Sequence, residues 1–187
     1  MSSNPENSLK IENVVASTKL NDELDLVSLA SLIPGAEYNK KRFPGVVLRI
    51  QDPKIAALVF GSGKVVLTGA KSVENLNKGL AYLVKLFKSL NIDIIDNPTY
   101  SIQNIVTSAD LGSHLNLNKI AMSFNLDKIE YEPEQFPGLV YRLEDPKVVV
   151  LLFGSGKLII TGGKKPDEDA RRAVKKIYDD LVASNLL

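Results

Sequence analysis

The sequence has no cysteine and only one histidine among its 187 residues. Without cysteine the chain has no disulfides, thiolate zinc sites, iron–sulfur clusters or cysteine nucleophiles. His114 alone leaves almost no material for a histidine metal cluster or for a Ser-His-Asp triad. We therefore expect no metal and no cofactor, and most classes of enzyme are poorly supported.

Long apolar runs and an excess of one charge are also absent. No apolar stretch approaches the roughly 20 residues that span a bilayer, and the N-terminal MSSNPENSLK lacks the apolar core of a secretory signal. Lys and Arg number 23 against 22 Asp and Glu, so the net charge is +1. These features predict a soluble intracellular protein with no membrane partner, in which any basic surface for nucleic acid is local.

What the sequence does contain is an internal repeat. Residues 42–71 align with residues 135–164 at an offset of 93, and 17 of the 30 aligned positions are identical. Upstream, IENVVAST at 11–18 matches IQNIVTSA at 102–109 at an offset of 91. A repeat of about half the chain predicts a duplicated half-domain with a pseudo-twofold axis. The chain then divides into a disordered tail at 1–9, a first repeat at 10–100 and a second repeat at 101–187.

Each repeat contains the same series of predicted elements. Runs such as GVVLRI, AALVFG and KVVLTG, with their counterparts GLVYRL, VVVLLFG and KLIITG, predict strands, and the short turns between them predict antiparallel neighbours. Apolar residues near helical spacing predict a helix around Leu29 and another around Ile120. A longer helix is predicted at the end of each repeat, through Leu83 and Ile177. The fold class is therefore α+β.

The predicted strands are apolar on both faces. Residues 56–60 and 148–153 have no polar residue at either parity, although a helical layer covers only one face of an antiparallel sheet. We expect another element or a partner to bury the other face, because an exposed apolar patch of that size is rare in a monomer. A second helical layer, a homodimer that sandwiches the sheets and an extended apolar ligand are the alternatives.

Cations beside these strands favour a polyanion with an apolar interior, such as a DNA duplex opened at its minor groove. They are Lys41, Arg42, Arg49, Lys54, Lys64, Arg142, Lys147 and Lys157.

Two stretches, EYNKKRFPGVVLRIQDPKIAALVFGSGKVVLTGAK and YEPEQFPGLVYRLEDPKVVVLLFGSGKLIITGGK, resemble the signature stretches of the TATA-box-binding protein family. With the IENVV and IQNIV strands, the resemblance covers about residues 10–184. It implies a saddle of ten antiparallel strands with helices on the convex face. The short N-terminal extension and the lack of cysteine resemble archaeal members. The implied location is inside the cell on DNA, in the cytoplasm or nucleoid of an archaeon or the nucleus of a eukaryote.

The resemblance implies a general transcription factor, not an enzyme, that binds A·T-rich promoter DNA, the TATA box, through the minor groove. Two phenylalanine pairs would wedge between base steps and kink the duplex: Phe43, Phe60, Phe136 and Phe153. Two asparagines would donate to the acceptors that A·T pairs present in that groove: Asn13 and Asn104. A floor would contact sugars and base edges: Val15, Val106, Leu58, Leu151, Val66, Ile159, Thr68 and Thr161.

Five cations match positions near phosphates, where they would anchor the DNA without reading its sequence: Arg42, Arg49, Lys64, Arg142 and Lys157. The loops before the first phenylalanine of each pair differ in charge, since residues 39–42 are basic and residues 132–135 are acidic. The resemblance implies that the acidic loop binds transcription factor B through Glu132, Glu134 and Gln135. That factor would connect the chain to the RNA polymerase pre-initiation complex.

An apolar-ligand carrier or a sheet-mediated homodimer is the alternative function, and a homodimer of the DNA-free protein would hide the apolar face. These alternatives explain the apolar face but not the paired asparagines and cations. An enzyme has little support. The run Gly61-Ser62-Gly63-Lys64 is not a P-loop, because that motif needs glycine at position 58, where Leu58 stands.

Overall fold

The computed structural model describes residues 4–125 and 127–187, which form two compact units. The first unit is Asn13–Gln103. The second unit is Asn104–Leu187 together with the described residues up to Glu12. The unit boundaries thus fall three residues later than the predicted repeat boundaries, and the N-terminal segment joins the second unit.

The first unit contains a four-stranded antiparallel sheet in the order β2-β3-β4-β1. Its elements are β1 (Lys10–Lys19, which begins in the second unit), α1 (Leu26–Leu32), β2 (Val46–Gln51), β3 (Lys54–Val59), β4 (Lys64–Ala70) and α2 (Val73–Ser89). The strand register pairs Val47 with Leu58 and Leu58 with Val66. Because directly opposed residues point the same way, these three side chains share one face of the sheet.

The second unit repeats this plan with the strand order β5-β9-β8-β7-β6. Its elements are β5 (Tyr100–Asp110, which begins in the first unit), α3 (Leu117–Ser123), β6 (Ile129–Glu130), β7 (Leu139–Glu144), β8 (Lys147–Leu152), β9 (Lys157–Gly162) and α4 (Glu168–Ala183). Here the register pairs Val140 with Leu151 and Leu151 with Ile159, so the equivalent side chains again share a face.

The predicted α+β class is confirmed, and the described residues contain nine strands where the resemblance implied ten. In the second unit, Ile129 and Glu130 pair with the edge strand β7. The counterpart in the first unit is a single bridge between Glu37 and Val47. The tenth strand is thus reduced to one residue pair.

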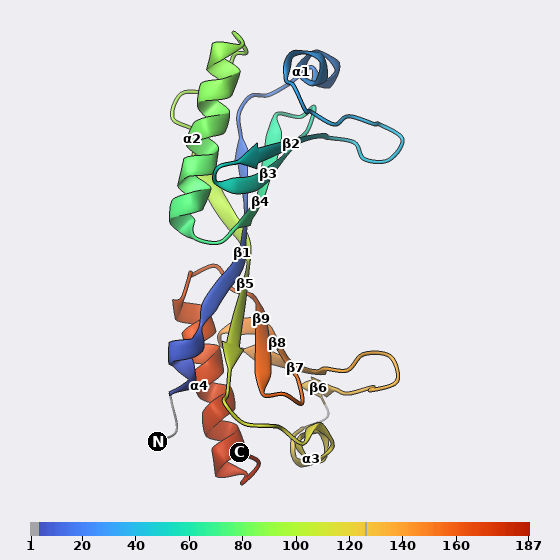
Figure 1. The fold of residues 1–187 in the computed structure, drawn as a ribbon, viewed down its shortest axis with the longest axis vertical. Helices are drawn as coiled ribbons and strands as arrows, with labels where there is room; N and C mark the ends of the chain where they lie inside the picture. Colours follow the sequence, from blue (N-terminus) through green and yellow to red (C-terminus); the bar gives the residue numbers. More distant parts are fainter. Residues whose placement is uncertain (1–3, 126) are drawn as a thin grey trace. The chain divides into compact units, whose positions relative to one another are not determined.

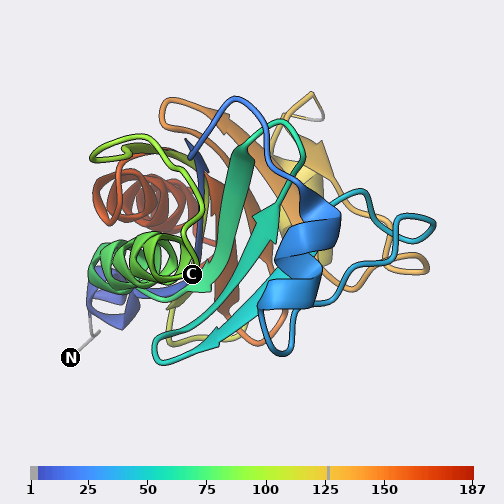
Figure 2. The same cartoon turned by 90° about the horizontal axis from the view of Figure 1, so that it is seen from above.

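Burial alternates along the strands, with one parity facing the long helix of the unit. In β3, Ile55 is buried, and Gly79 of α2 lies so close that a Cβ there would be 2.7 Å from Ile55 Cδ1. Ala56 and Leu58, at the opposite parity, are only partly buried. Figures 1 and 2 show α2 beside the strands of its unit, with the segment between α1 and β2 projecting away from it. The helix therefore covers one sheet face.

The long helices fit because their apolar stripes match the strand face that they cover. Ser72 caps the N-terminus of helix α2, because its Oγ accepts a hydrogen bond from the Asn75 N–H at 3.0 Å. Its stripe includes Leu83 and Phe87, which are fully buried. In the second unit, the stripe of α4 shares one core with strands β7, β8 and β9.

The N-terminal segment differs from the disordered tail predicted at 1–9. Helix η1 (Pro5–Ser8) is a 3-10 helix whose proline is buried. The Asp110 N–H donates a hydrogen bond to Ser8 Oγ at 2.7 Å, which attaches the segment to β5 of the second unit. Burial of the proline and this hydrogen bond offset the entropy lost on ordering. Residues 1–3 lie outside the described residues.

The short helices α1 and α3 begin at side-chain caps. Asp25 Oδ1 accepts from the Ser28 N–H at 3.2 Å, and Asn116 Oδ1 accepts from the Lys119 N–H at 3.1 Å. The hydrogen bonds from the Ser28 N–H and hydroxyl lower the pKa of Asp25.

Across residues 4–125 and 127–187, no helix combines the length and apolar character needed to span a membrane.

We predict that Phe87→Ala lowers the free energy of unfolding by about 3–5 kcal/mol, because it empties a fully buried ring position. Tyr82→Ala on the same helix is the control, since that residue is 49% exposed, and we expect a loss of at most about 1 kcal/mol. Urea denaturation measures both. Equal losses would contradict the assigned buried face of α2.

Candidate functional site

Each unit leaves one strand face uncovered by its long helix, and we call this the open face. In the first unit its partly buried residues are Val15, Val47, Ala56, Leu58, Val66 and Thr68. In the second unit they are Val106, Val140, Val149, Leu151, Ile159 and Thr161. All eight floor residues named from the sequence lie on these two faces. The long helices do not seal them.

A pair of phenylalanine rings lies at one end of each open face. The ring centroids of Phe43 and Phe60 are 5.6 Å apart with an interplanar angle of 62°. Those of Phe136 and Phe153 are 5.9 Å apart at 71°. Both are edge-to-face contacts, which the ring quadrupoles favour. In each pair one ring follows a strand end and the other comes from the preceding loop. Phe136 is 39% exposed.

A glycine makes room for each ring pair. A Cβ at Gly45 would lie 2.9 Å from the Val59 carbonyl oxygen and 3.0 Å from Phe43 Cε1. A Cβ at Gly138 would lie 2.7 Å from Phe136 Cε1 and 3.1 Å from Phe153 Cε1. Ordinary contacts of a Cβ are 3.4–4 Å. Any side chain at either position would therefore displace the rings.

The two asparagines are held by residues of their own units. Asn13 Oδ1 accepts a hydrogen bond from the Gly69 N–H at 2.7 Å, and its Nδ2 donates to Thr68 Oγ1 at 3.4 Å. Asn104 Nδ2 donates to Thr161 Oγ1, also at 3.4 Å. Because a bond at 3.4 Å is long and weak, each amide can still donate to an acceptor that approaches the open face.

Two of the predicted phosphate contacts are ion-paired. Arg49 Nη2 lies 3.5 Å from Glu37 Oε2, and Arg142 Nη2 lies 2.9 Å from Glu130 Oε2. The arginine side chains are 61% and 57% exposed, so each pair contributes about 1 kcal/mol or less. A phosphate can therefore replace either carboxylate at small cost.

The other predicted cations differ in where they lie. Lys64 and Lys157 begin β4 and β9 at the same strand parity as the open-face residues that follow them. Arg42 is exposed in the loop before Phe43.

The acidic loop lies between β6 and β7, and its three predicted contact residues are exposed: Glu132, Glu134 and Gln135. The Phe136 N–H closes a turn by donating to the Glu132 carbonyl at 3.0 Å. In the first unit the Phe43 N–H donates to the Asn39 carbonyl at the same distance. The two loops thus share a backbone turn and differ in charge.

Comparisons with known proteins cover almost the whole chain. The family model described as "Transcription factor TFIID (or TATA-binding protein, TBP)" matches residues 8–90 and 99–183. The chain belongs to the TATA-box-binding protein family. Members of this family are DNA-binding transcription factors and not enzymes. The two matched segments correspond to the two repeats.

Archaeal relatives support the same membership. The TATA-box-binding protein of Archaeoglobus fulgidus is 56% identical over 179 residues, covering 96% of this chain and 97% of the relative. TATA-box-binding protein 2 of Haloferax volcanii is 54% identical over 185 residues, covering 99% of each chain. The solved structure of Methanococcus jannaschii TBP has a TM-score of 0.85 at 53% identity, covering 94% of this chain and 99% of that chain.

Sequence reasoning missed two features of this TATA-box-binding protein family member. The ion pairs of Arg49 and Arg142 escaped notice because their carboxylates lie 12 residues upstream, beyond any local pattern. The role of Gly45 and Gly138 was also missed, although Phe-Pro-Gly precedes β2 and β7 in both repeats.

Among the described residues, no group of three or more His, Asp or Glu could hold a metal ion.

We predict that Gly138→Ala separates the Phe136 and Phe153 rings, because the new Cβ would lie 2.7 Å from the first ring. Overpacking of this kind costs about 1–3 kcal/mol. Gly154→Ala is the control, since the nearest atom to its new Cβ is at 3.8 Å. Ring-to-ring nuclear Overhauser contacts should weaken in the first variant and persist in the second. Unchanged contacts in Gly138→Ala would refute the proposed role of this glycine.

Proposed function

We propose that this chain binds A·T-rich promoter DNA through the minor groove, kinks it with its phenylalanine pairs, and recruits transcription factor B and RNA polymerase inside the cell. The observation that carries the proposal is the open face, repeated in each unit. It combines a partly exposed apolar floor, a phenylalanine pair, a donor amide and cations. Membership of the TATA-box-binding protein family supports the same conclusion.

The energetics of ring insertion show why the floor is needed as well as the rings. An aromatic side chain buries about 150–250 Å² in full, and each Å² contributes about 25 cal/mol. Because Phe136 is 39% exposed before binding, its further burial contributes about 2 kcal/mol. Unstacking one base step costs a few kcal/mol. The ring pairs therefore roughly offset the kink, and net affinity must come from the rest of the open face and the phosphate contacts.

The asparagine amides support selection of A·T pairs. In the minor groove these pairs present only acceptors, adenine N3 and thymine O2, whereas a G·C pair adds the guanine amino donor. With Oδ1 of Asn13 engaged by the Gly69 N–H, the amide offers Nδ2 as a donor. A guanine amino group is itself a donor, so it cannot accept a hydrogen bond from Nδ2 and would repel it. Deformability of A·T-rich steps adds selectivity without any base contact.

The cations account for affinity and for its response to salt. Each phosphate neutralised by a Lys or Arg makes log K fall with log salt by about 0.9. Arg49 and Arg142 would exchange Glu37 and Glu130 for phosphate on binding. An apolar-ligand carrier that used the same floor would show no such salt dependence.

We predict that Phe60→Ala and Phe153→Ala each reduce both the affinity for an A·T-rich duplex and the bend angle, because each removes half of a ring pair. Tyr82→Ala on α2 is the control. Gel mobility and end-to-end fluorescence energy transfer measure binding and bending, and a salt titration with the wild type tests the phosphate contacts. Full bending by both phenylalanine variants would contradict the role of the ring pairs, and salt-independent binding would contradict the phosphate contacts and favour the carrier.

We predict that the double variant Glu132→Lys with Glu134→Lys abolishes the ternary complex with transcription factor B and retains binding to DNA. The reversed charge repels a basic partner surface, while the phenylalanine pair behind the loop stays in place. Mobility shifts with DNA alone and with added transcription factor B separate the two effects. A ternary complex that survives the charge reversal would show that this loop is not the contact.

A further inference from the structure

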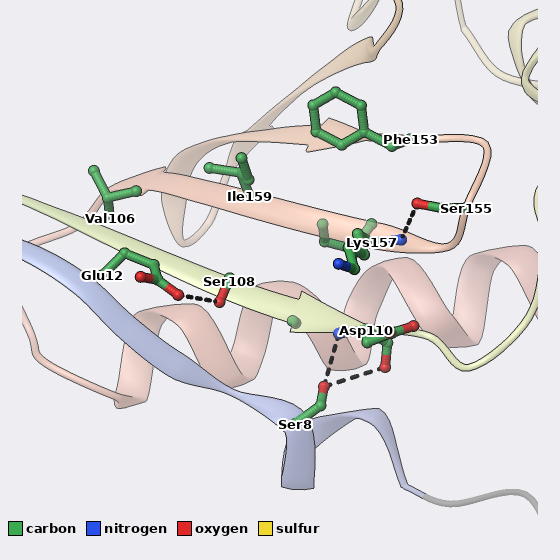
Figure 3. Close-up of a pocket in the computed structure, with 11 residues that line it drawn as sticks. Ser8, Glu12, Val106, Ser108, Asp110, Phe153, Ser155, Lys157 and Ile159 are labelled. Atoms are coloured by element: carbon green, nitrogen blue, oxygen red, sulfur yellow. Dashed lines mark hydrogen bonds between the residues drawn. The ribbon is translucent and has the colours of Figure 1, made fainter.

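The two open faces carry different charges at equivalent positions beside the second phenylalanine of each pair. In the second unit a depression of about 630 Å³ lies there, lined by Phe153 and Ile159 and also by Glu12, Asp110 and Lys157. Figure 3 shows these side chains around the depression, with the Glu12 and Asp110 carboxylates on the same side as Ser108 and Ser8. The two carboxylates thus lie beside residues proposed to contact DNA.

The repeat allows a residue-by-residue comparison with the first unit. Most of the lining is conserved between the copies, since Val15, Ser17, Phe60, Ser62 and Lys64 stand where Val106, Ser108, Phe153, Ser155 and Lys157 stand in the second unit. The charges are not conserved. Gln103 occupies the position of Glu12, and Lys19 occupies the position of Asp110.

One hydrogen bond shows that the two positions are equivalent in space as well as in sequence. In the second unit, Ser108 Oγ donates to Glu12 Oε1 at 2.8 Å. In the first unit, Gln103 Nε2 donates to Ser17 Oγ at 2.9 Å. The same pair of positions is therefore in contact in both units, with the direction of donation reversed and the negative charge present in only one.

The residues at these equivalent positions give the two units different charges. Lys19 and Lys64 give the first patch a charge of +2, whereas Lys157 with the two carboxylates gives the second patch −1. Lys19 Nζ lies 2.9 Å from Asp22 Oδ1, and including that exposed carboxylate reduces the difference from three charges to two. Within residues 4–125 and 127–187, neither Glu12 nor Asp110 has a cation within 4.0 Å that would neutralise it.

We infer that Glu12 and Asp110 make the second unit the weaker and more salt-tolerant of the two DNA-binding halves, so that Lys19 and its neighbours in the first unit anchor the complex. This inference rests on the proposed binding of DNA. A carboxylate that faces phosphates repels them, and it also takes the place of a cation that would release a counterion. The apolar floors are alike, so phosphate anchoring distinguishes the halves.

The first test compares affinities for one A·T-rich duplex by fluorescence anisotropy from 50 to 300 mM salt. Glu12→Gln should tighten binding about threefold at low salt, and Asp110→Lys about tenfold with a slope steeper by about 0.9. Lys19→Asp should weaken binding by a similar factor and flatten the slope. Glu74→Gln and Lys85→Asp, both on α2, are the controls for net charge and should leave affinity nearly unchanged.

The second test reads the orientation directly. Because the chain has no cysteine, Val182→Cys on α4 gives a single site for a dye in the second unit. The duplex carries a symmetric A·T-rich site, uncharged methylphosphonate linkages in one half and a second dye at that end. Energy transfer should place the second unit on the uncharged half in the wild type. The preference should disappear in the Glu12→Gln, Asp110→Lys double variant.

The outcomes separate this inference from the proposed function. If the wild type fails to bind the duplex, the proposed function and the inferred inequality of the two units are both overturned. If it binds, but Glu12 and Asp110 variants change affinity no more than the α2 controls, or the orientation on the half-neutral duplex is random, only the inequality of the halves is overturned.

Discussion

The constraint on which this structure depends is that a strand has two faces and a half-domain of about 90 residues has one long helix to cover them. In the first unit, α2 packs so closely on the strand parity of Ile55 that a Cβ at Gly79 would press on the Ile55 side chain. The other parity stays partly open although it is lined by valine, leucine and isoleucine. A hydrophobic face left in this state needs a partner, and its chemistry decides what that partner is.

The open face is specific because polar and aromatic groups are fixed around the apolar floor. The rings of each phenylalanine pair meet edge to face, and a Cβ in place of the glycine beside them would crowd the pair. The Asn13 amide is oriented by a backbone N–H, and the two arginines rest against carboxylates that an incoming anion can replace. A surface that binds only an apolar ligand requires none of these features. A minor groove, with acceptors on its floor and phosphates along its edges, matches all of them.

The sequence predicted those features that a local residue pattern specifies and that occur in both repeats. Two copies of the same strand runs and turns were enough for the α+β class, and the resemblance to the TATA-box-binding protein family named the Phe and Asn residues that lie at the open faces. Features that depend on distant or single contacts escaped prediction. Helix η1 is ordered by a buried proline and by Asp110, about 100 residues away in the chain, and the Glu37 bridge replaces a strand through one residue pair. A difference in charge between the two units also escaped prediction. Lys19 and Asp110 occupy equivalent positions, and their opposite charges become evident only when the two open faces are compared.

The most direct measurement is methyl NMR of the wild-type protein titrated with an A·T-rich duplex. The account predicts that the methyl signals of Leu58, Val66, Leu151 and Ile159 shift strongly, since each would pass from partial exposure to contact with DNA. The methyls of Val27 and Val182, which are 70% and 48% exposed on helices, should keep their positions. Shifts confined to the helix methyls, with the open-face signals unchanged, would contradict the central claim that the uncovered strand faces bind the DNA.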